Sequence, residues 1–433
     1  MSSNIITGKI SIARKIRYVM INTVLLNIGI AILILLFPLS PKITVTLLQK
    51  PIALRLDDII VPILFFIWLA ELLFKKRHFT FNRLFIPVGV FFLVGVISTL
   101  VGYYLKHSIA DPFYAACVIL RSAEYYIIFC LTVNILKTKK QLINYFNVWL
   151  VTAIFIALYG ILDCLFNVSG PTGLYDQGWF SSQSNHLGGY LMISLILAVG
   201  LYSVAKNKLQ RKLSLIAVPL IASALLFDLS RTTYLSTAVA VSVYCLLKSK
   251  KLIVVPIFLL ALLFWFIPQM FPQTLVGRYL ESTRKHTFSL NTVPRAPGTS
   301  IASDFSAADH RFLIKRAFKI ASEHPLIGEG LGARELVYYD SQLALVPASM
   351  GMMGSLVFIW LLVAIWEMAI ARYRNTTDTY LREVARVFLA IFAGLLVHSI
   401  ASVAFLIAVI AYAFWFLAGV TCLIPHLSKP QNN

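Results

Sequence analysis

Long apolar segments and short polar segments alternate along nearly the whole chain. About twelve windows each hold ~20 mostly apolar residues, the length that an α-helix needs to cross the hydrocarbon core of a bilayer. Each window is continuously apolar and lacks the residue-by-residue alternation of a membrane β-barrel strand, so it predicts a transmembrane helix. The windows lie near residues 18–39, 58–74, 84–105, 113–136, 143–166, 185–205, 213–229, 232–247, 252–271, 343–371, 386–404 and 405–425.

This pattern predicts an all-α, polytopic membrane protein with about 12 transmembrane helices and one large extracytoplasmic loop that contains helix. Composition agrees, because 59% of the residues are hydrophobic, only 13% are charged and the mean hydropathy is +0.81. We expect three regions: residues 1–270 with spans one to nine, residues 271–342 as the extracytoplasmic loop, and residues 343–433 with spans ten to twelve and a cytoplasmic tail.

Lysine and arginine residues follow alternate spans and so indicate the orientation of the chain. Basic clusters precede the first span and follow the second, fourth, sixth, eighth and tenth, whereas residues 167–184 contain neither residue type. These clusters all face one side of a twelve-span bundle, which predicts cytoplasmic termini and an extracytoplasmic long loop. Most of the net charge of +20 therefore comes from the basic residues of the cytoplasmic loops, which also favour contact with the anionic inner leaflet. No nucleic-acid partner is expected.

The long loop, residues 271–342, is the only long polar interval between apolar windows and is dense in charge. If the protein is an enzyme, its chemistry belongs in this loop and in the short loops on the same side. The second half of the loop predicts a helix that starts at Ser306 or Asp309 and ends at His324-Pro325.

Two features of this predicted helix and of the turn after it bear on binding. Arg311, Lys315 and Lys319 recur at every fourth residue and form one basic stripe, which is either a solvated face or a surface for lipid phosphate. The glycine-rich run from Gly328 to Gly332 predicts a flexible turn.

Further polar positions lie on the same side as the long loop. Asn185 and His186 open the sixth span, where they either cap and pack the helix or offer its free N–H groups to an anion. Arg231 lies in the short turn between spans seven and eight, with either Asp228 or a phosphate as its partner. Asp340 stands at the mouth of the tenth span, where it is either a helix cap or a reactive carboxylate.

Arg121, Glu124 and His398 are ionisable residues inside apolar windows, where charge is costly. Arg121 and Glu124 share one face of the fourth span, so they either form an internal salt bridge or line a substrate groove. His398 lies inside the eleventh span, where it is either a hydrogen-bonded packing residue or a proton carrier, and we favour the packing residue.

Four motifs, taken in order, carry a resemblance to a known family. They are Asn-x-Leu-Gly at residues 185–188, Ser230-Arg231, the helix of Arg311 ending in the run 324–332, and the Gly-x-x-Gly pair at residues 351–354. They resemble the O-antigen ligase and O-antigen polymerase superfamily, the bacterial membrane enzymes that join lipid-linked glycans. The resemblance covers roughly residues 160–405.

The resemblance implies a twelve-helix protein of the bacterial inner (plasma) membrane with its active site at the periplasmic face, under the large loop. It implies a polyprenyl-diphosphate-linked glycan, with undecaprenyl as the carrier, as the donor substrate, and neither a metal nor another cofactor. Membrane lipid and, in the same pathway, a chain-length regulator and a flippase are the expected partners.

The resemblance also implies roles for individual residues. Arg231 and Arg311 match the family's diphosphate-gripping arginines, and Arg278 or Arg284 matches a further loop arginine. Asp340 stands where ligases carry a histidine that activates the acceptor hydroxyl, and this departure favours the polymerase-type members.

The remaining candidates lie beside these positions. Lys315 is a further diphosphate-binding candidate, and the candidates for the substrate groove are Asn185, His186, Tyr339 and Gln342.

The favoured hypothesis is an inverting glycosyltransferase that polymerises oligosaccharide repeat units. Arginines stabilise the leaving diphosphate without a metal, and a carboxylate takes the proton of the attacking hydroxyl. The first alternative is a ligase that transfers glycan to lipid A core. The second is a twelve-span secondary transporter, which is disfavoured because midplane charges are few, broken helices are not evident and the two halves are unequal.

Overall fold

The computed structural model describes residues 24–47, 50–75, 79–166, 184–228, 230–249, 307–333 and 341–428. Its elements are the helix Val24–Leu39, β1 (Lys42–Leu47), β2 (Lys50–Arg55), α2 (Asp57–Lys75), α3 (Phe85–Tyr104), α4 (Pro112–Ile135), α5 (Lys139–Phe166), α6 (Ser184–Val204), α7 (Lys208–Phe227), α8 (Arg231–Lys248), α11 (Ala307–Glu323), α12 (Gln342–Asn375), α13 (Thr379–His398) and α14 (Ala408–Leu427).

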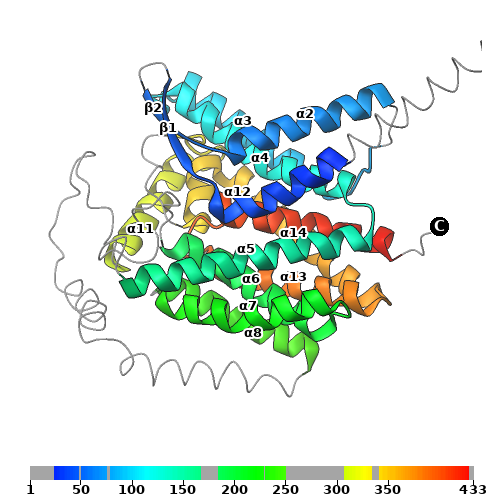
Figure 1. The fold of residues 1–433 in the computed structure, drawn as a ribbon. Helices are drawn as coiled ribbons and strands as arrows, with labels where there is room; N and C mark the ends of the chain where they lie inside the picture. The colour runs from blue at the N-terminus through cyan, green and yellow to red at the C-terminus, as the bar shows by residue number, and fades with distance from the viewer. Residues whose placement is uncertain are drawn as a thin grey trace, which may run out of the picture.

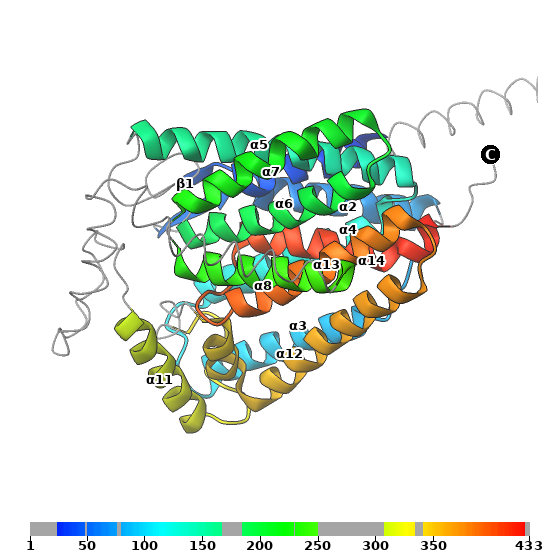
Figure 2. The same ribbon diagram turned by 90° about the horizontal axis from the view of Figure 1, so that it is seen from below.

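The prediction of an all-α, multi-pass membrane protein is confirmed. Every predicted span coincides with a helix except the ninth, 252–271, which lies outside the described residues. Within the described part of the chain, seven helices are long and apolar enough to cross a membrane. The helices run side by side, and α11 crosses one end of the bundle (Figures 1 and 2). We call this end the α11 end.

The core of the bundle is built around α14, α6 and α13. α14 is apolar on all sides and is almost entirely buried, as expected of a helix that other helices surround. Aromatic rings fill the space around it: Trp149 of α5 stacks on Tyr190 of α6 at 5.9 Å, and Phe37 stacks on Tyr412 at 5.6 Å. A rigid centre of this kind gives the helix ends fixed positions.

A β-hairpin precedes α2 and was not expected from the apolar windows. β1 and β2 pair antiparallel, with Lys42 opposite Arg55 and Leu47 opposite Lys50. The hairpin is visible at the α11 end in Figure 1. Its first strand, Lys-Ile-Thr-Val-Thr-Leu, is rich in β-branched residues, and this signal favours a strand.

α12 is not one continuous helix. Gly351 has φ 63° and ψ −159°, which interrupts the helix one-quarter of the way along its length. Residues 325–331 lie at this interruption, and we call them the wedge loop. Figure 2 shows α12 lying along α3 and α11 lying across the start of α12. The expectation that broken helices are absent is therefore wrong.

The wedge loop takes the backbone hydrogen bonds that the interruption leaves open. The N–H groups of Met352 and Met353 donate to Pro325 O at 2.7 Å and to Leu326 O at 3.2 Å. In the opposite direction, Glu329 N donates to Ala348 O at 3.0 Å, and Gly330 N donates to Ser349 O at 2.8 Å. Within a membrane bundle such groups have no water to bind, so a protein segment has to satisfy them.

Two glycines make this close contact between backbones possible. A Cβ at Gly351 would lie 2.5 Å from Ile327 N, and a Cβ at Gly328 would lie 2.5 Å from Met350 N. Both residues also have positive φ, of 63° and 72°, which glycine adopts without strain. The expectation of a flexible turn at residues 328–332 is therefore wrong, because this run is packed and hydrogen-bonded.

Replacing Gly351 by alanine should destabilise the protein clearly. The positive φ alone costs about 1–3 kcal/mol for a residue with a Cβ, and the overlap with Ile327 N adds to this. The melting temperature of the purified protein in detergent should fall. The control is Gly89→Ala in α3, where the added Cβ meets nothing within 4 Å. Equal melting temperatures for the two variants would contradict the role given to Gly351.

Candidate functional site

The beginnings of α6 and α8 meet the end of α7 at the α11 end. Gly188 of α6 is so close to its neighbours that a Cβ there would lie 2.3 Å from both Asp228 Oδ2 and Thr233 Oγ1. The Ser230 hydroxyl caps α8 by accepting the Thr233 N–H at 3.3 Å. This cap starts α8 at Arg231 and places the backbone of Arg231 at the junction.

Asp228 is a buried carboxyl at the centre of this junction. Its side chain is 2% exposed, and neither oxygen has a hydrogen-bond partner of good geometry among the described residues. Burial raises the pKa of Asp228 to about 8, although the Thr233 hydroxyl beside it acts in the opposite direction. The carboxyl is therefore largely protonated at neutral pH.

The start of α12 is attached to the segment that follows α13. The Gln342 N–H lies 3.1 Å from both Ser399 O and Ser402 O. Since Gln342 is the first residue of α12, this contact brings the segment after Asp340 to the α11 end. Gln342 is buried, and its side-chain oxygen has no partner within the described chain.

Gln342 also lines an apolar cavity of about 30 Å³ between α3, α4 and α12. Ser122 and Ser349 also line it, and most of the wall is formed by aliphatic residues such as Ile119 and aromatic residues such as Phe91. The cavity is large enough for a water molecule but too small for a sugar ring. It therefore has room for a water molecule that could hydrogen-bond to the buried side-chain amide of Gln342.

His398 joins α13 to α6 and α8. Its Nδ1 lies 3.3 Å from the Ser236 hydroxyl, and a Cβ at Gly189 would lie 3.4 Å from its Nε2. The ring is fully buried. The interpretation of His398 as a hydrogen-bonded packing residue is confirmed.

α11 lies across the α11 end with one apolar face and one basic face. Ala317 and Ile320 are buried in a cluster with Ala344 and Ala348 of α12. Lys315 is exposed on the opposite face, as the predicted stripe requires. The predicted helix is confirmed, and it begins at Ala307.

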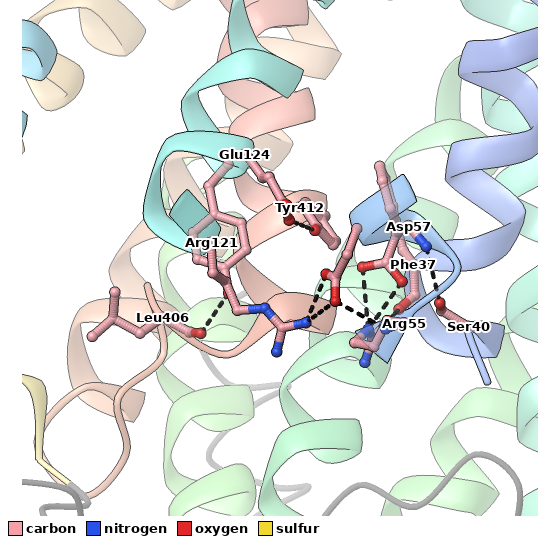
Figure 3. Close-up of polar contacts among 10 residues, drawn as sticks. Phe37, Ser40, Arg55, Asp57, Arg121, Glu124, Leu406 and Tyr412 are labelled. Atoms are coloured by element: carbon pink, nitrogen blue, oxygen red, sulfur yellow. Dashed lines mark hydrogen bonds and ion pairs between the residues drawn. The ribbon is translucent and has the colours of Figure 1, made fainter. Parts of the chain in front are cut away.

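The charges inside α4 belong to a second polar network at the same end, which Figure 3 shows. Arg121 donates to both oxygens of Asp58 in α2 at 2.6 Å. Glu124 instead accepts the Tyr412 hydroxyl at 2.9 Å. The expected salt bridge between Arg121 and Glu124 is therefore wrong, because α2 presents a better placed carboxylate.

The hairpin and α2 contribute a further ion pair to this network. Arg55 Nε lies 3.0 Å from Asp57 Oδ1, and Arg55 also donates to Phe37 O at 3.1 Å (Figure 3). These contacts satisfy the charges internally and tie the hairpin to the bundle. The network therefore has a structural explanation that needs no ligand.

The predicted site residues fall into three groups. His186, Lys315 and Gln342 lie at the α11 end with described side chains. Asn185, Arg231 and Arg311 lie at the same end, but only their backbones are described. The remaining candidates lie outside the described residues: Arg278, Arg284, Tyr339 and Asp340.

Sequence reasoning missed the central place of Asp228 and gave no role to Thr233. The available signal was the Gly188-Gly189 pair, because adjacent glycines at a helix start indicate close approach by neighbouring segments. The sequence did not indicate that Gly188 approaches Asp228 and Thr233.

The Asp228 carboxyl should make stability depend on pH. Because its folded pKa of about 8 lies above the unfolded value, the wild-type protein should lose stability relative to Asp228→Asn as pH rises toward 8. The slope approaches about 1.4 kcal/mol per pH unit. Melting temperatures of both proteins between pH 5 and pH 8 test this.

Asp378 provides a control with a pKa shift of opposite sign. Burial acts to raise its pKa, but the Lys139 ammonium and the backbone N–H groups of Leu381 and Tyr380 together lower it. Asp378 is therefore ionised in both the folded and the unfolded protein throughout this range, so the stability difference between Asp378→Asn and wild type should stay constant from pH 5 to pH 8. Only at lower pH should Asp378→Asn lose stability relative to wild type as pH rises. Parallel pH profiles for Asp228→Asn and wild type would refute the assignment at Asp228.

Comparison with known proteins finds a family match that includes the end of α7 and the start of α8. Residues 215–359, about a third of the chain, match a family model described as O-antigen ligase. The match confirms the resemblance to the O-antigen ligase and polymerase superfamily. It spans most of α7, all of α8 and α11, the wedge loop and the first half of α12. No curated protein matches the chain.

Proposed function

We propose that this protein is an inverting glycosyltransferase that polymerises oligosaccharide repeat units carried on a polyprenyl diphosphate. One observation carries the proposal: α6, α8 and α12 all begin at the α11 end, where α8, α11 and the first half of α12 belong to the segment that matches the O-antigen ligase family. Helix N-termini carry partial positive charge, but α7 and α13 end here as well and their C-termini carry the opposite charge. We therefore assign the attraction for an anionic group such as a diphosphate mainly to cationic side chains.

The diphosphate is the leaving group of the reaction. Arg231 starts α8 and Arg311 lies on α11, so two guanidinium groups belong to elements at this end of the bundle. We assign them to the diphosphate, with Lys315 and the loop residues Arg278 and Arg284 as further cations. Fixed cations stabilise the charge that develops as the bond to the sugar breaks.

Asp340 is the proposed general base. It lies two residues before Gln342, whose N–H is attached to the segment after α13. The carboxylate takes the proton of the acceptor hydroxyl while the hydroxyl oxygen attacks the anomeric carbon. The new glycosidic bond forms as the bond from that carbon to the diphosphate oxygen breaks, and the lipid diphosphate departs. A single displacement of this kind inverts the anomeric centre.

The remaining groove residues are assigned to the glycan. His186 and Asn185 at the start of α6, Tyr339 and Gln342 flank the elements that carry the cations and the base. Their amide, imidazole and phenol groups can donate hydrogen bonds to sugar hydroxyls and accept hydrogen bonds from them.

The positive-inside pattern supports the orientation. Among the described residues, the basic clusters that follow α4, α6 and α12 lie at the end of the bundle opposite to α11. We therefore place both termini in the cytoplasm and the α11 end in the periplasm of a bacterial inner membrane. In this arrangement residues 271–342 are the catalytic loop, between membrane regions 1–270 and 343–433.

A secondary transporter is less well supported. Transporters use the open backbone groups of broken helices to bind substrate or ions. At the break in α12 the wedge loop already occupies Ala348 O, Ser349 O and the N–H groups that follow Gly351. The family match also supports glycan handling over transport.

Loss of either central residue should abolish glycan extension. Asp340→Ala removes the base and Arg311→Ala removes a cation from the leaving group, so each should lower the rate at least about 100-fold. The measurement is polymer formation by purified protein from lipid-linked repeat units. Arg316→Ala, on the exposed side of the same helix as Arg311, is the matched control and should keep near-wild-type activity. Full activity of both test variants would end the catalytic assignment.

Lipopolysaccharide gels of a deletion strain separate a polymerase from a ligase. A lost polymerase leaves lipid A core capped with a single repeat unit, because the ligase of the cell still transfers it. A lost ligase leaves bare core and accumulates lipid-linked polymer. We expect the single-repeat pattern. Bare core would instead identify the protein as a ligase.

A further inference from the structure

The wedge loop is held by polar side chains of α3, a helix that is otherwise apolar. The Ser98 hydroxyl lies 2.6 Å from Ile327 O and 2.6 Å from Ser349 O. A hydroxyl has one proton, so the two carbonyls share it. The Thr99 hydroxyl accepts the Leu331 N–H at 3.1 Å.

Two more side chains continue this row just beyond the end of α3. The Lys106 ammonium donates to Gly328 O, and the Ser108 hydroxyl donates to Glu329 O at 2.7 Å. We call Ser98, Thr99, Lys106 and Ser108 the α3 seat. Its members bind the three consecutive carbonyls of residues 327–329 and the N–H of residue 331, so the seat fixes both the position and the register of the loop.

The wedge loop links two elements of the proposed site. It follows directly after α11, which carries Arg311 and Lys315. Its backbone bonds hold the first part of α12, residues 342–350, which follows Asp340. α11 also packs on this part of α12 through the cluster of Ala317 and Ala344.

These contacts join α11, the wedge loop and residues 342–350 into one unit. The interruption at Gly351 separates this unit from the membrane-crossing remainder of α12. Four side chains of the α3 seat and the Gln342 N–H hydrogen-bond it to the rest of the bundle. Its wedge loop also accepts the Met352 and Met353 N–H groups, and Ile109 and Ala115 pack on its apolar cluster. Arg231 belongs to α8, on the other side of Gln342 from the seat.

We propose that the α3 seat sets the distance between this unit and the rest of the active site, and that Ser98 and Thr99 are positioning residues for glycan transfer. The inference rests on the function proposed above, in which Asp340 is the base and Arg231 grips the diphosphate. A displacement of about 1 Å between reacting groups lowers a rate by about 100-fold, so two or three hydrogen bonds at the seat are enough to control the reaction.

Ser98→Thr and Ser98→Val make the sharpest pair of variants. Threonine and valine have the same shape, so both add the same methyl group to a buried position, but only threonine keeps the hydroxyl. We expect kcat of Ser98→Val to be at least about 10-fold below that of Ser98→Thr. The KM for the lipid-linked donor should change less than about 3-fold, because the unit still forms.

Matched controls test whether any buried hydroxyl would give this result. Ser242 of α8 donates to Ala238 O at 2.7 Å within its own helix, so Ser242→Thr and Ser242→Val should have equal kcat. Thr99→Val should lower kcat, whereas Thr421→Val in α14, which loses only a bond to Leu417 O, should not.

The solvent end of the seat provides a second route if Ser98→Val does not accumulate in the membrane. Lys106→Met removes the donor to Gly328 O, and Lys106→Arg keeps a cation with donors. Lys106→Met should lower kcat relative to Lys106→Arg without changing the melting temperature by more than a few degrees.

The outcomes separate this inference from the function it rests on. If Ser98→Thr and Ser98→Val have the same kcat, the seat has no positioning role. If the Ser98 variants cannot be produced, equal kcat values for Lys106→Met and Lys106→Arg lead to the same conclusion. That result leaves the polymerase intact as long as Asp340→Ala is inactive. If Asp340→Ala extends glycan at the wild-type rate, the proposed base is wrong whatever the seat variants do.

Discussion

A helix that is interrupted inside a membrane bundle leaves backbone N–H and C=O groups that cannot hydrogen-bond to water. In this protein the interruption of α12 at Gly351 is closed by the wedge loop, which supplies two carbonyls and two N–H groups at distances of 2.7 to 3.2 Å. Positive φ at Gly328 and Gly351 lets the two backbones touch. The positions of α11 and of the start of α12 both depend on this contact.

The contact also explains how an apolar bundle presents polar chemistry at one end. α14, α6 and α13 form a packed centre that carries few charges, and the ends of α6, α8 and α12 meet around it. Buried polar groups at this end have specific neighbours, such as Asp228 beside Thr233 and His398 beside Ser236. A low-dielectric surrounding makes each fixed dipole and cation more effective than it would be in water.

Much of the fold was readable from the chain, but the site was readable only in part. Continuous apolar windows predicted the membrane helices, and helix start and stop residues predicted α11, because both signals are local in the sequence. The partner of Arg121 was not readable, because Asp58 is 63 positions away and becomes its neighbour only when α2 packs on α4. The same holds for Ser98, which lies in a helix whose apolar sequence predicted only a membrane span.

The sequence by itself determined the membrane class, the helices, the orientation signal and the resemblance to enzymes that join lipid-linked glycans. These features are encoded in composition, periodicity and short motifs, which need no knowledge of distant neighbours. Only the tertiary structure decided that α12 is interrupted, that the glycine run is a packed wedge, and that Asp228 lies buried against Gly188. These facts depend on which backbones approach each other, and no local pattern in a chain records that.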